Sequence, residues 1–445
     1  MKGAIDLALG GGTFTVQNKL LPGAYINFVS ASHASAELSD RGTAALPMVL
    51  DWGSEGEVFT VTAEEFQRES LRIFGYPYTA PEMKGLRDFF LGAKTGHFYR
   101  LNGGSKASCT LADARYSGTR GNALKIVVEA GEGESQEAPV YDVSVYMEGT
   151  LAASQKGVRT IADLTDNDFV SWKSGASLSL TAGMSLAGGT TAEVQESAWQ
   201  TALEKLESMS FNTLGCLSAD GTVKALFAAY TKRMRDENGV KFQTVLHQYA
   251  AAADYEGVIS VENGLSGAES DPSLVYWVTG AEAGCAVNAA LTNSLYTGEF
   301  IPDTDYTQTA LGNAIRAGKF IFHRVGTQVR VLSDINTFTS VTEGKTADFS
   351  DNQVIRVLDQ IGNDIAVLFN TRYLGKVPND NAGRISFWKD ICRHHEQMQD
   401  IRAIQDFDSA KVSVQQGDSK KSVLVTDFVT PTCAMTQLYM TVTVS

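Results

Sequence analysis

The chain has 445 residues, of which 43% are hydrophobic and 20% are charged, an ordinary composition for a globular protein with more than one domain. Its net charge of −14 excludes nucleic acid as the main partner, because phosphate binding needs a basic face. The N-terminus lacks the basic and apolar regions of a signal peptide, and no run approaches about 18 apolar residues. We therefore expect a soluble protein that is made in the cytoplasm and does not insert into a membrane.

The charge is unevenly distributed along the chain. Residues 300–445 carry 15 Lys/Arg and 16 Asp/Glu, whereas residues 1–299 carry 22 and 35. This split predicts that the first two thirds face solvent and that the last third is committed to contacts. The cysteines are odd in number, widely spaced and without a C-x-x-C pair, so we expect reduced thiols at Cys109, Cys216, Cys285, Cys392 and Cys433.

The N-terminus has the pattern of an arm that pairs with a neighbouring sheet. Residues 13–17 alternate between polar and apolar side chains, the period of a half-buried strand, and three glycines precede them. We predict that residues 1–20 form an arm that hinges at these glycines and adds a strand to another subunit. The arm residues are Thr13, Phe14 and Val16, and the hinge residues are Gly10, Gly11 and Gly12.

Residues 21–104 predict an α/β segment that packs with the middle of the chain. Strands are expected at 24–29 and 97–101, and a helix is expected to begin at Thr62, whose hydroxyl can cap it ahead of acidic residues in the first turn. Strands that alternate with helices are typical of an α/β layer.

The sequence pattern changes over residues 105–193, where short strand-like runs are separated by loops rich in glycine, serine and acidic residues. This pattern predicts an inserted β-sandwich or barrel. Its clearest strands are expected at 124–129, 141–147 and 178–182.

From residue 194 the alternation of strands and helices returns, which predicts an α/β domain over 194–335 with a parallel sheet. An α+β inner domain is expected over 336–430, with a first helix capped by Ser350 or Asp351. Further expected elements are strands at 211–217, 241–247 and 256–261, helices at 198–209, 223–235, 274–291, 354–368 and 385–398, and hairpins at 320–332 and 411–429.

The chain ends on a second strand pattern. Residues 422–429 and 435–444 predict a last strand pair, and the second of these places Leu438, Met440, Val442 and Val444 on one face. A terminus that is patterned as a strand needs a partner, because dangling residues bury too little surface to offset about 1–2 kcal/mol of backbone entropy each. We predict that residues 431–445 form a C-terminal arm with a hinge near Pro431.

Sequence motifs for catalysis are missing. The chain lacks the phosphate-binding G-x-x-x-x-G-K-[ST], a G-x-G-x-x-G between strand and helix, and the nucleophile elbow G-x-S-x-G. His394 and His395 are the only histidine pair, and adjacent helical residues point about 100° apart, which disfavours a shared metal. We therefore predict no catalytic residue, no metal ligand and no cofactor.

One loop carries a more specific pattern. Residues 114–124 read ARYSGTRGNAL, with two glycines that permit positive φ before an asparagine and a strand. This order resembles the signature of contractile-tail sheath proteins, found in long-tailed phages and phage-tail-like bacteriocins. The signature positions are Tyr116, Gly118, Arg120, Gly121 and Asn122. Residues 11–14 and 22–28 also resemble the N-terminus of sheath proteins from prophages of Gram-positive bacteria.

The resemblance implies a structural, non-enzymatic subunit. In that family, subunits stack as rings or helical strands around an inner tail tube, and arms from neighbours complete a small sheet on the inner domain. The implied partners are the protein itself as a helical homopolymer, the tube protein, and baseplate and tail terminator proteins, in a particle released on lysis. The family's middle domain is described as subtilisin-like in fold, a likeness that carries no catalytic triad here.

Two alternative functions are compatible with parts of the sequence. A surface-layer lattice protein would also be acidic and rich in strands, but the missing signal peptide disfavours it. A hydrolase on the α/β domain would need a catalytic triad assembled from distant residues.

Overall fold

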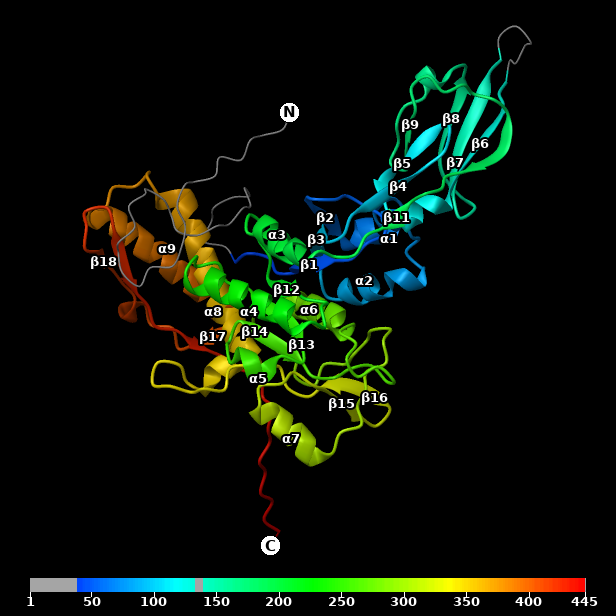
Figure 1. Cartoon of the computed structure of the whole chain (residues 1–445). Coiled ribbons are helices and arrows are strands. Elements are labelled where there is room, and N and C mark those ends of the chain that lie inside the picture. Colours follow the sequence, from blue (N-terminus) through cyan, green and yellow to red (C-terminus); the bar gives the residue numbers. More distant parts are fainter. Residues whose placement is uncertain (1–37, 133–138, 445) are drawn as a thin grey trace. The chain divides into compact units, whose positions relative to one another are not determined.

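The structure of the chain is a computed structural model, and it describes residues 38–132 and 139–444 (Figure 1). The chain divides into two compact units of mixed α and β structure. Unit 1 combines the residues up to Ala45 with Asp88–Thr95 and Leu206–Ser445, and unit 2 combines Leu46–Arg87 with Gly96–Lys205. The predicted N-terminal arm and the strand expected at 24–29 lie outside the described residues.

The helix expected at Thr62 is confirmed, and local hydrogen bonds explain where it begins and ends. The Thr62 hydroxyl accepts from the Glu65 N–H at 3.2 Å, and the Glu65 carboxylate accepts from the Thr62 N–H at 2.9 Å, a capping box. The helix stops at Gly75, whose φ of 79° suits glycine. The elements of this stretch are β1 (Thr43–Met48), β2 (Val58–Thr62), α1 (Ala63–Phe74), α2 (Lys84–Phe89) and β3 (Thr95–Arg100).

The predicted β-sandwich is present in unit 2. Two four-stranded sheets, ordered β10-β6-β7-β8 and β11-β4-β5-β9, enclose a buried core that includes Ile126, Val145 and Val170 (Figure 1). The strand expected at 178–182 forms three residues later. The strands are β4 (Gly104–Ser108), β5 (Ala112–Ser117), β6 (Leu124–Ala130), β7 (Tyr141–Met147), β8 (Thr150–Val158), β9 (Val170–Trp172), β10 (Thr181–Ser185) and β11 (Thr190–Thr191), and α3 (Glu196–Leu206) follows.

The predicted parallel sheet is confirmed in unit 1. The start of β1 pairs with β12 in parallel, β12 with β13, and β13 with β14. The sequence features that predicted this sheet were its short connections and apolar strands. Both are typical of a parallel sheet that is covered by helices. The elements are β12 (Thr213–Gly215), α4 (Gly221–Asp236), β13 (Gln243–His247), α5 (Ala250–Ala253), β14 (Val258–Val261) and α6 (Leu274–Gly284).

The alanine-rich helix expected at 274–291 is shorter than predicted. It ends at Gly284, because Cys285 takes extended backbone angles of φ −62° and ψ 127°. Close packing sets this region: a Cβ on Gly280 would lie 1.9 Å from the Phe89 carbonyl oxygen, and a Cβ on Gly284 would lie 2.1 Å from the Gly92 carbonyl oxygen. The alanine content of residues 274–291 indicates a high helix propensity, but it carries no information on this tertiary contact.

The last third of unit 1 follows the predicted order. The Asp351 carboxylate caps α8 by accepting from the N–H groups of Gln353 and Val354. Side chains from α8, α9 and the β18–β19 hairpin share one core that includes Leu368, Phe387 and Ile391. The elements are α7 (Gln308–Arg316), β15 (Phe322–Val325), β16 (Gln328–Val331), α8 (Asn352–Leu368), α9 (Asn381–Asp400), β17 (Ile404–Gln405), β18 (Ser413–Gln416), β19 (Val423–Thr426) and β20 (Thr430–Pro431).

The predicted last strand pair is wrong in its pairing. β19 pairs with β18, so the hairpin expected around residues 417–420 is correct, but β20 pairs with β17. Residues 435–444 form no strand with any described part of the chain. None of the helices in the described ranges is long and apolar enough to span a membrane.

Candidate assembly segments and signature loop

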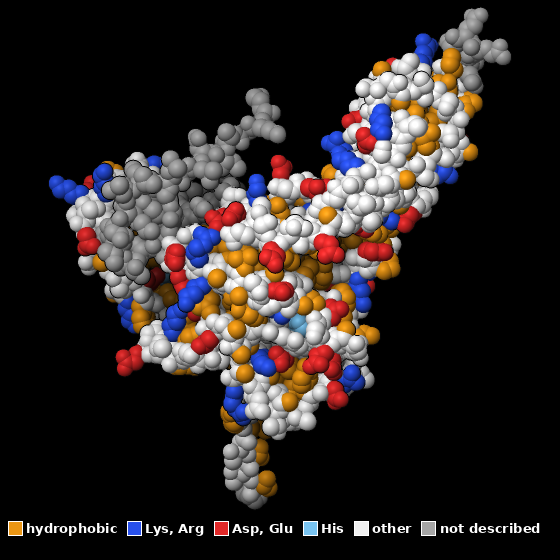
Figure 2. Space-filling model, viewed as in Figure 1, with side chains coloured by type: hydrophobic (Ala, Val, Ile, Leu, Met, Phe, Trp, Pro, Cys, Tyr) orange, Lys and Arg blue, Asp and Glu red, His pale blue; other side chains and the backbone are white. Residues whose placement is uncertain are grey.

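The C-terminal segment exposes apolar side chains along its whole length. Met435 is 101% exposed, Leu438 85%, Met440 74%, Val442 69% and Val444 89%. The segment stands clear of the folded part of unit 1, with hydrophobic side chains along it (Figures 1 and 2). Among the described residues, this is a run of neighbouring exposed apolar groups of the kind that is typical of an interaction surface.

The contacts that anchor this segment end just before it. Pro431, the predicted hinge, is held in β20 opposite Ile404. The Thr432 N–H donates to the Ala403 carbonyl at 3.0 Å, and the Ala434 N–H donates to the Gln353 side chain at 2.9 Å. The chain therefore leaves the folded unit after Ala434, three residues beyond the position that we predicted. The hinge glycines Gly10, Gly11 and Gly12 and the arm residues Thr13, Phe14 and Val16 lie outside the described residues.

The signature loop forms a buried junction inside unit 2. Gly118 has a φ of 121°, and a Cβ there would lie 1.9 Å from the Asp51 carbonyl oxygen. Gly121 packs against the methyl groups of Ala107 and Ala114. A Cβ added at Gly121 would lie 3.0 Å from the first and 3.1 Å from the second, which is closer than normal van der Waals contact. Backbone conformation and close approach therefore both require glycine at 118, whereas at Gly121 only the close approach disfavours a side chain.

Arg120 and Asn122 make the polar contacts of the same junction. Arg120 Nε donates to the Gly75 carbonyl at 2.6 Å, and its two Nη atoms donate to the Glu148 carboxylate at 2.5 and 3.0 Å. The guanidinium also lies 4.1 Å from the ring centre of Tyr76. The Asn122 side chain exchanges two hydrogen bonds of 2.8 Å with the backbone of Gly189.

The remaining signature residue, Tyr116, packs edge-on against Trp52 with ring centres 5.3 Å apart. Sequence reasoning missed Arg100, which is 2% exposed and donates to the carbonyl oxygens of Gly53 (3.0 Å) and Ser117 (3.1 Å). An isolated arginine in a strand carries no sequence signal for such a role. All five signature residues thus lie in contacts within unit 2, and the loop presents no set of converging reactive groups.

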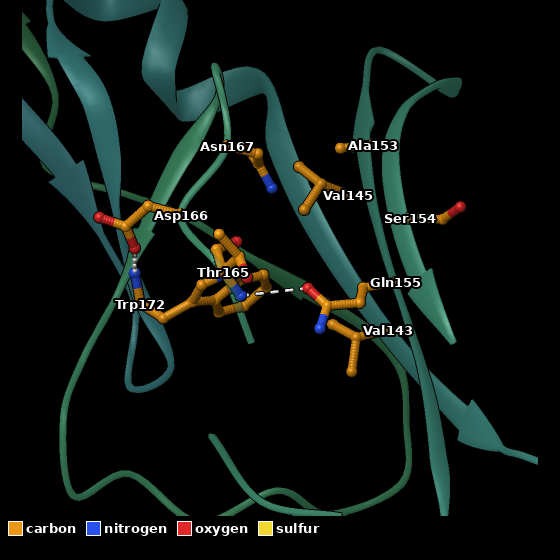
Figure 3. A pocket seen from close by; sticks show the side chains of 9 residues that line it. All are labelled: Val143, Val145, Ala153, Ser154, Gln155, Thr165, Asp166, Asn167 and Trp172. Carbon is orange, nitrogen blue, oxygen red and sulfur yellow. Dashed lines mark hydrogen bonds between the residues drawn. The ribbon is translucent and has the colours of Figure 1, made fainter. Parts of the chain in front are cut away.

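One hollow of the sandwich is lined by polar groups that make hydrogen bonds within unit 2. It has a volume of about 200 Å³ and lies between β7, β8 and the loop before β9 (Figure 3). The Asp166 carboxylate accepts from the Trp172 N–H at 2.8 Å, and the Gln155 side chain accepts from the Thr165 N–H at 3.1 Å. These polar groups hold the loop rather than face an open space.

Ligands of α/β folds bind at the carboxyl ends of parallel strands, and here Cys216 and His247 lie at the ends of β12 and β13. Burial raises the pKa of the Cys216 thiol to about 12, which keeps it protonated. His247 Nε2 lies 3.0 Å from the backbone oxygen of Asn263, and burial lowers the pKa of this ring. A neutral thiol and a histidine bound to backbone form no nucleophile–base pair.

The two adjacent histidines are closer than predicted. Their Nδ1 atoms lie 3.2 Å apart, because side-chain rotation brings these atoms together although adjacent helical residues point about 100° apart. In the described part of the chain no three or more His, Cys, Asp or Glu side chains gather in a way that could hold a metal ion. The five cysteines are free thiols.

Models of four phage tail sheath domains match the chain in succession. Residues 41–101 match the N-terminal region of domain III of tail sheath protein Gp18, 102–191 the sheath β-sandwich domain, 192–337 the sheath central domain, and 344–445 the sheath C-terminal domain.

Individual relatives cover nearly the whole chain. The phage-like element PBSX protein XkdK of Bacillus subtilis is 30% identical, over 98% of this chain and 100% of its own length. A sheath tail protein from Desulfitobacterium hafniense has a similar crystal structure, with a TM-score of 0.78 and 34% identity over 92% of this chain and 96% of its own. A sheath tail protein from Listeria innocua also reaches a TM-score of 0.78, with 29% identity over 89% of this chain and 93% of its own.

Proposed function

The chain belongs to the phage tail sheath family and is a structural subunit of a contractile tail sheath, and from this premise we propose that its copies polymerise around an inner tail tube by exchanging their terminal arms. The observation that carries this proposal is the exposed segment 435–444, whose apolar side chains alternate along a backbone that forms no strand with the described residues. A neighbouring sheet would supply both the missing hydrogen bonds and the missing cover.

A rough estimate of the free energy of one arm junction indicates that a single junction is weak and that many junctions together are strong. Burying Leu438, Met440, Val442 and Val444 would contribute about 6–12 kcal/mol at roughly 1.5–3 per side chain. Ordering the ten residues 435–444 costs about 10–20 kcal/mol, and each new backbone hydrogen bond returns about 0.5–1.5. One junction is therefore close to balance, and a sheath held by many junctions in parallel gains its stability from their number.

Several finer features belong to the same proposal. Residues 1–20 and 431–445 act as the two arms, 105–193 as the β-sandwich domain, 194–335 as a middle domain of subtilisin-like fold without a triad, and 336–430 as the inner domain, with 21–104 packed on the middle domain. The partners are the tube protein, the baseplate and the tail terminator. The subunit works without enzymatic activity, is made in the host cytoplasm and leaves the cell on lysis.

We propose further that contraction is driven by new contacts between outer domains and that the arms transmit motion. Strand addition uses main-chain hydrogen bonds that persist through rigid-body rotation, provided that the chain can hinge at its glycines and after Ala434. Sheaths assembled from a chain lacking residues 436–445 that still contracted as intact units would contradict this role of the arm.

Negative-stain electron microscopy of the purified protein, with and without the tube protein, tests the assembly itself. We expect tubes or rings from the wild type and unassembled subunits from the double variant Met440→Asp/Val442→Asp. The matched control is Thr441→Asp/Thr443→Asp, which adds the same charge to the opposite face of the strand and should assemble. If both double variants assembled, burial of this face would not hold the polymer together.

A further inference from the structure

One buried lysine of unit 1 has no counter-charge. The described part of the chain buries five Lys or Arg side chains, and four of them, Arg100, Arg120, Arg235 and Arg356, form an ion pair with a carboxylate. The fifth, Lys224, is 7% exposed, and its ammonium group forms neither an ion pair within 4.0 Å nor a hydrogen bond with any described residue. Because a buried charge is costly unless it is paired, Lys224 indicates a negative group that the described residues do not supply.

Lys224 lies near the start of α4, on the stripe of the helix that faces the parallel sheet. Phe227 and Thr231, three and seven residues further on, are both 0% exposed, and the Thr231 hydroxyl lies 2.6 Å from that of Thr244 in β13. α4 follows β12 and packs against β13, so it begins at the edge where these strands end (Figure 1). Because helical side chains point back toward the N-terminus of their helix, the Lys224 ammonium is directed to that edge.

Two groups at the carboxyl ends of the strands respond to the charge of Lys224. Burial raises the pKa of the Cys216 thiol, and the positive charge of Lys224 acts against this rise. Burial lowers the pKa of His247, the hydrogen bond to Asn263 opposes this, and the charge of Lys224 lowers it further. Both effects place the ammonium group within electrostatic range of the ends of β12 and β13.

The first turn of α4 leaves a free donor beside this ammonium group. The Asp220 carboxylate accepts from the N–H groups of Thr222 at 2.7 Å and Val223 at 3.1 Å, so it is committed to capping the helix. The Gly221 N–H donates to no described residue, and a Cβ on Gly221 would meet no atom within 4 Å. The positive end of the helix dipole therefore faces open space next to an unpaired lysine.

We propose that the first turn of α4 and the Lys224 ammonium form a binding site for an oxyanion, either a phosphate or a carboxylate, which supplies the missing counter-charge. The Gly221 N–H and the ammonium group are the donors, and an anion between them would neutralise both the lysine and the helix end. The site goes beyond the proposed function, because it depends neither on the terminal arms nor on polymerisation.

Calorimetric titration of the unassembled full-length protein with inorganic phosphate tests the site, with chloride keeping the ionic strength constant. We expect one phosphate to bind per wild-type subunit, and Lys224→Met to lose about tenfold or more in affinity, as expected for losing a charge-assisted hydrogen bond. The matched control is Lys232→Met, which removes the same charge from an exposed position of the same helix and should bind like the wild type. A wild type that binds no phosphate, or a Lys224→Met variant that binds it equally, would overturn the site.

A second pair of variants keeps the test decisive if Lys224→Met does not fold. Gly221→Glu places a carboxylate three residues before Lys224, where helical side chains are neighbours, and the open space can accept it. This variant should abolish phosphate binding, whereas the neutral Gly221→Gln should retain it. Equal phosphate affinities of the two variants would overturn the site.

The same titration on assembled tubes distinguishes the two sources of the anion. A carboxylate from a second copy would already fill the site in tubes and block phosphate, whereas a site for free phosphate would bind it in tubes and subunits alike. Failure to form tubes would instead contradict the proposed function and leave the titrations of the subunit unchanged.

Discussion

The signature loop and the C-terminal segment are the two stretches with the most distinctive sequence patterns, and structurally they are opposites. Within unit 2, Arg120 is 6% exposed and Gly118 leaves no space for a side chain. At the end of unit 1, Leu438 is 85% exposed and its backbone pairs with no described strand. A distinctive pattern can therefore mark a stretch that is buried in its own fold or one that the described part of the fold leaves exposed.

The difference separates two kinds of energetic role. Contacts of the loop are made within the chain, so they contribute to the stability of the folded subunit. The segment 435–444 is exposed among the described residues, so under the proposed function its contacts would contribute only on assembly. Substitutions in the loop should thus change unfolding, whereas changes in the segment should alter polymerisation alone.

The largest effect is expected for Gly118→Ala. The added Cβ would meet the Asp51 carbonyl oxygen at 1.9 Å in addition to the strain of a φ of 121°. We expect a loss of more than about 3 kcal/mol in the free energy of unfolding, measured by urea denaturation. Gly149→Ala is the matched control, with a φ of 82° and no atom within 4 Å, and should lose only about 1–2 kcal/mol. Equal losses would show that the close approach to Asp51 is unimportant.

A smaller effect is expected for Arg120→Gln. This change removes the hydrogen bonds to the Gly75 carbonyl and to Glu148, and we expect a loss of about 1.5–3 kcal/mol by the same measurement. Glu148→Gln should lose less than about 1 kcal/mol, since its side chain is 62% exposed and solvent screens the pair.

The pH dependence of the Glu148 effect has a definite sign. Its hydrogen bond to Arg120 lowers the pKa of Glu148, so the pair stabilises the fold above the ordinary carboxyl value and loses that contribution as the pH falls through the lowered pKa. Wild type and Glu148→Gln should therefore converge in acid. A Glu148→Gln loss as large as that of Arg120→Gln would mean that Arg120 acts mainly through this ion pair and not through Gly75.

Local signals in the sequence predicted the fold well where an element depends mainly on residues close to it in the sequence. The cap at Thr62 and the alternation that gave β12, β13 and β14 depend on neighbours in sequence, and both predictions are confirmed. The overrun of α6 past Gly284 arose because alanine content says nothing of the close packing against Gly92.

The candidate sites were predictable to a lesser degree. The signature loop was found by pattern, but its contacts with Gly75 and Gly189 join residues distant in sequence. The histidine pair was visible in the sequence, but its contacts were not, since rotamers and the carboxylate of Asp427, 32 residues further on, set the ring positions. A strand at 435–444 was predicted from its period, but these residues form no strand with the described part of the chain, and the partner strand that the period calls for stays a prediction.

The smallest effect on stability is expected for removal of the C-terminal segment itself. Deleting residues 435–445 takes away side chains that are exposed in the subunit, so the free energy of unfolding should stay within about 0.5 kcal/mol of the wild type. Deleting residues 430–445 is the sharper comparison, because it also removes β20 and its pairing with Ile404 and Gln405. Only this longer deletion should lower the stability of the subunit, while both should abolish tubes. A marked destabilisation by the shorter deletion would show that the segment packs on its own subunit. The signature loop and the C-terminal segment would then both stabilise the subunit, and the difference between them would disappear.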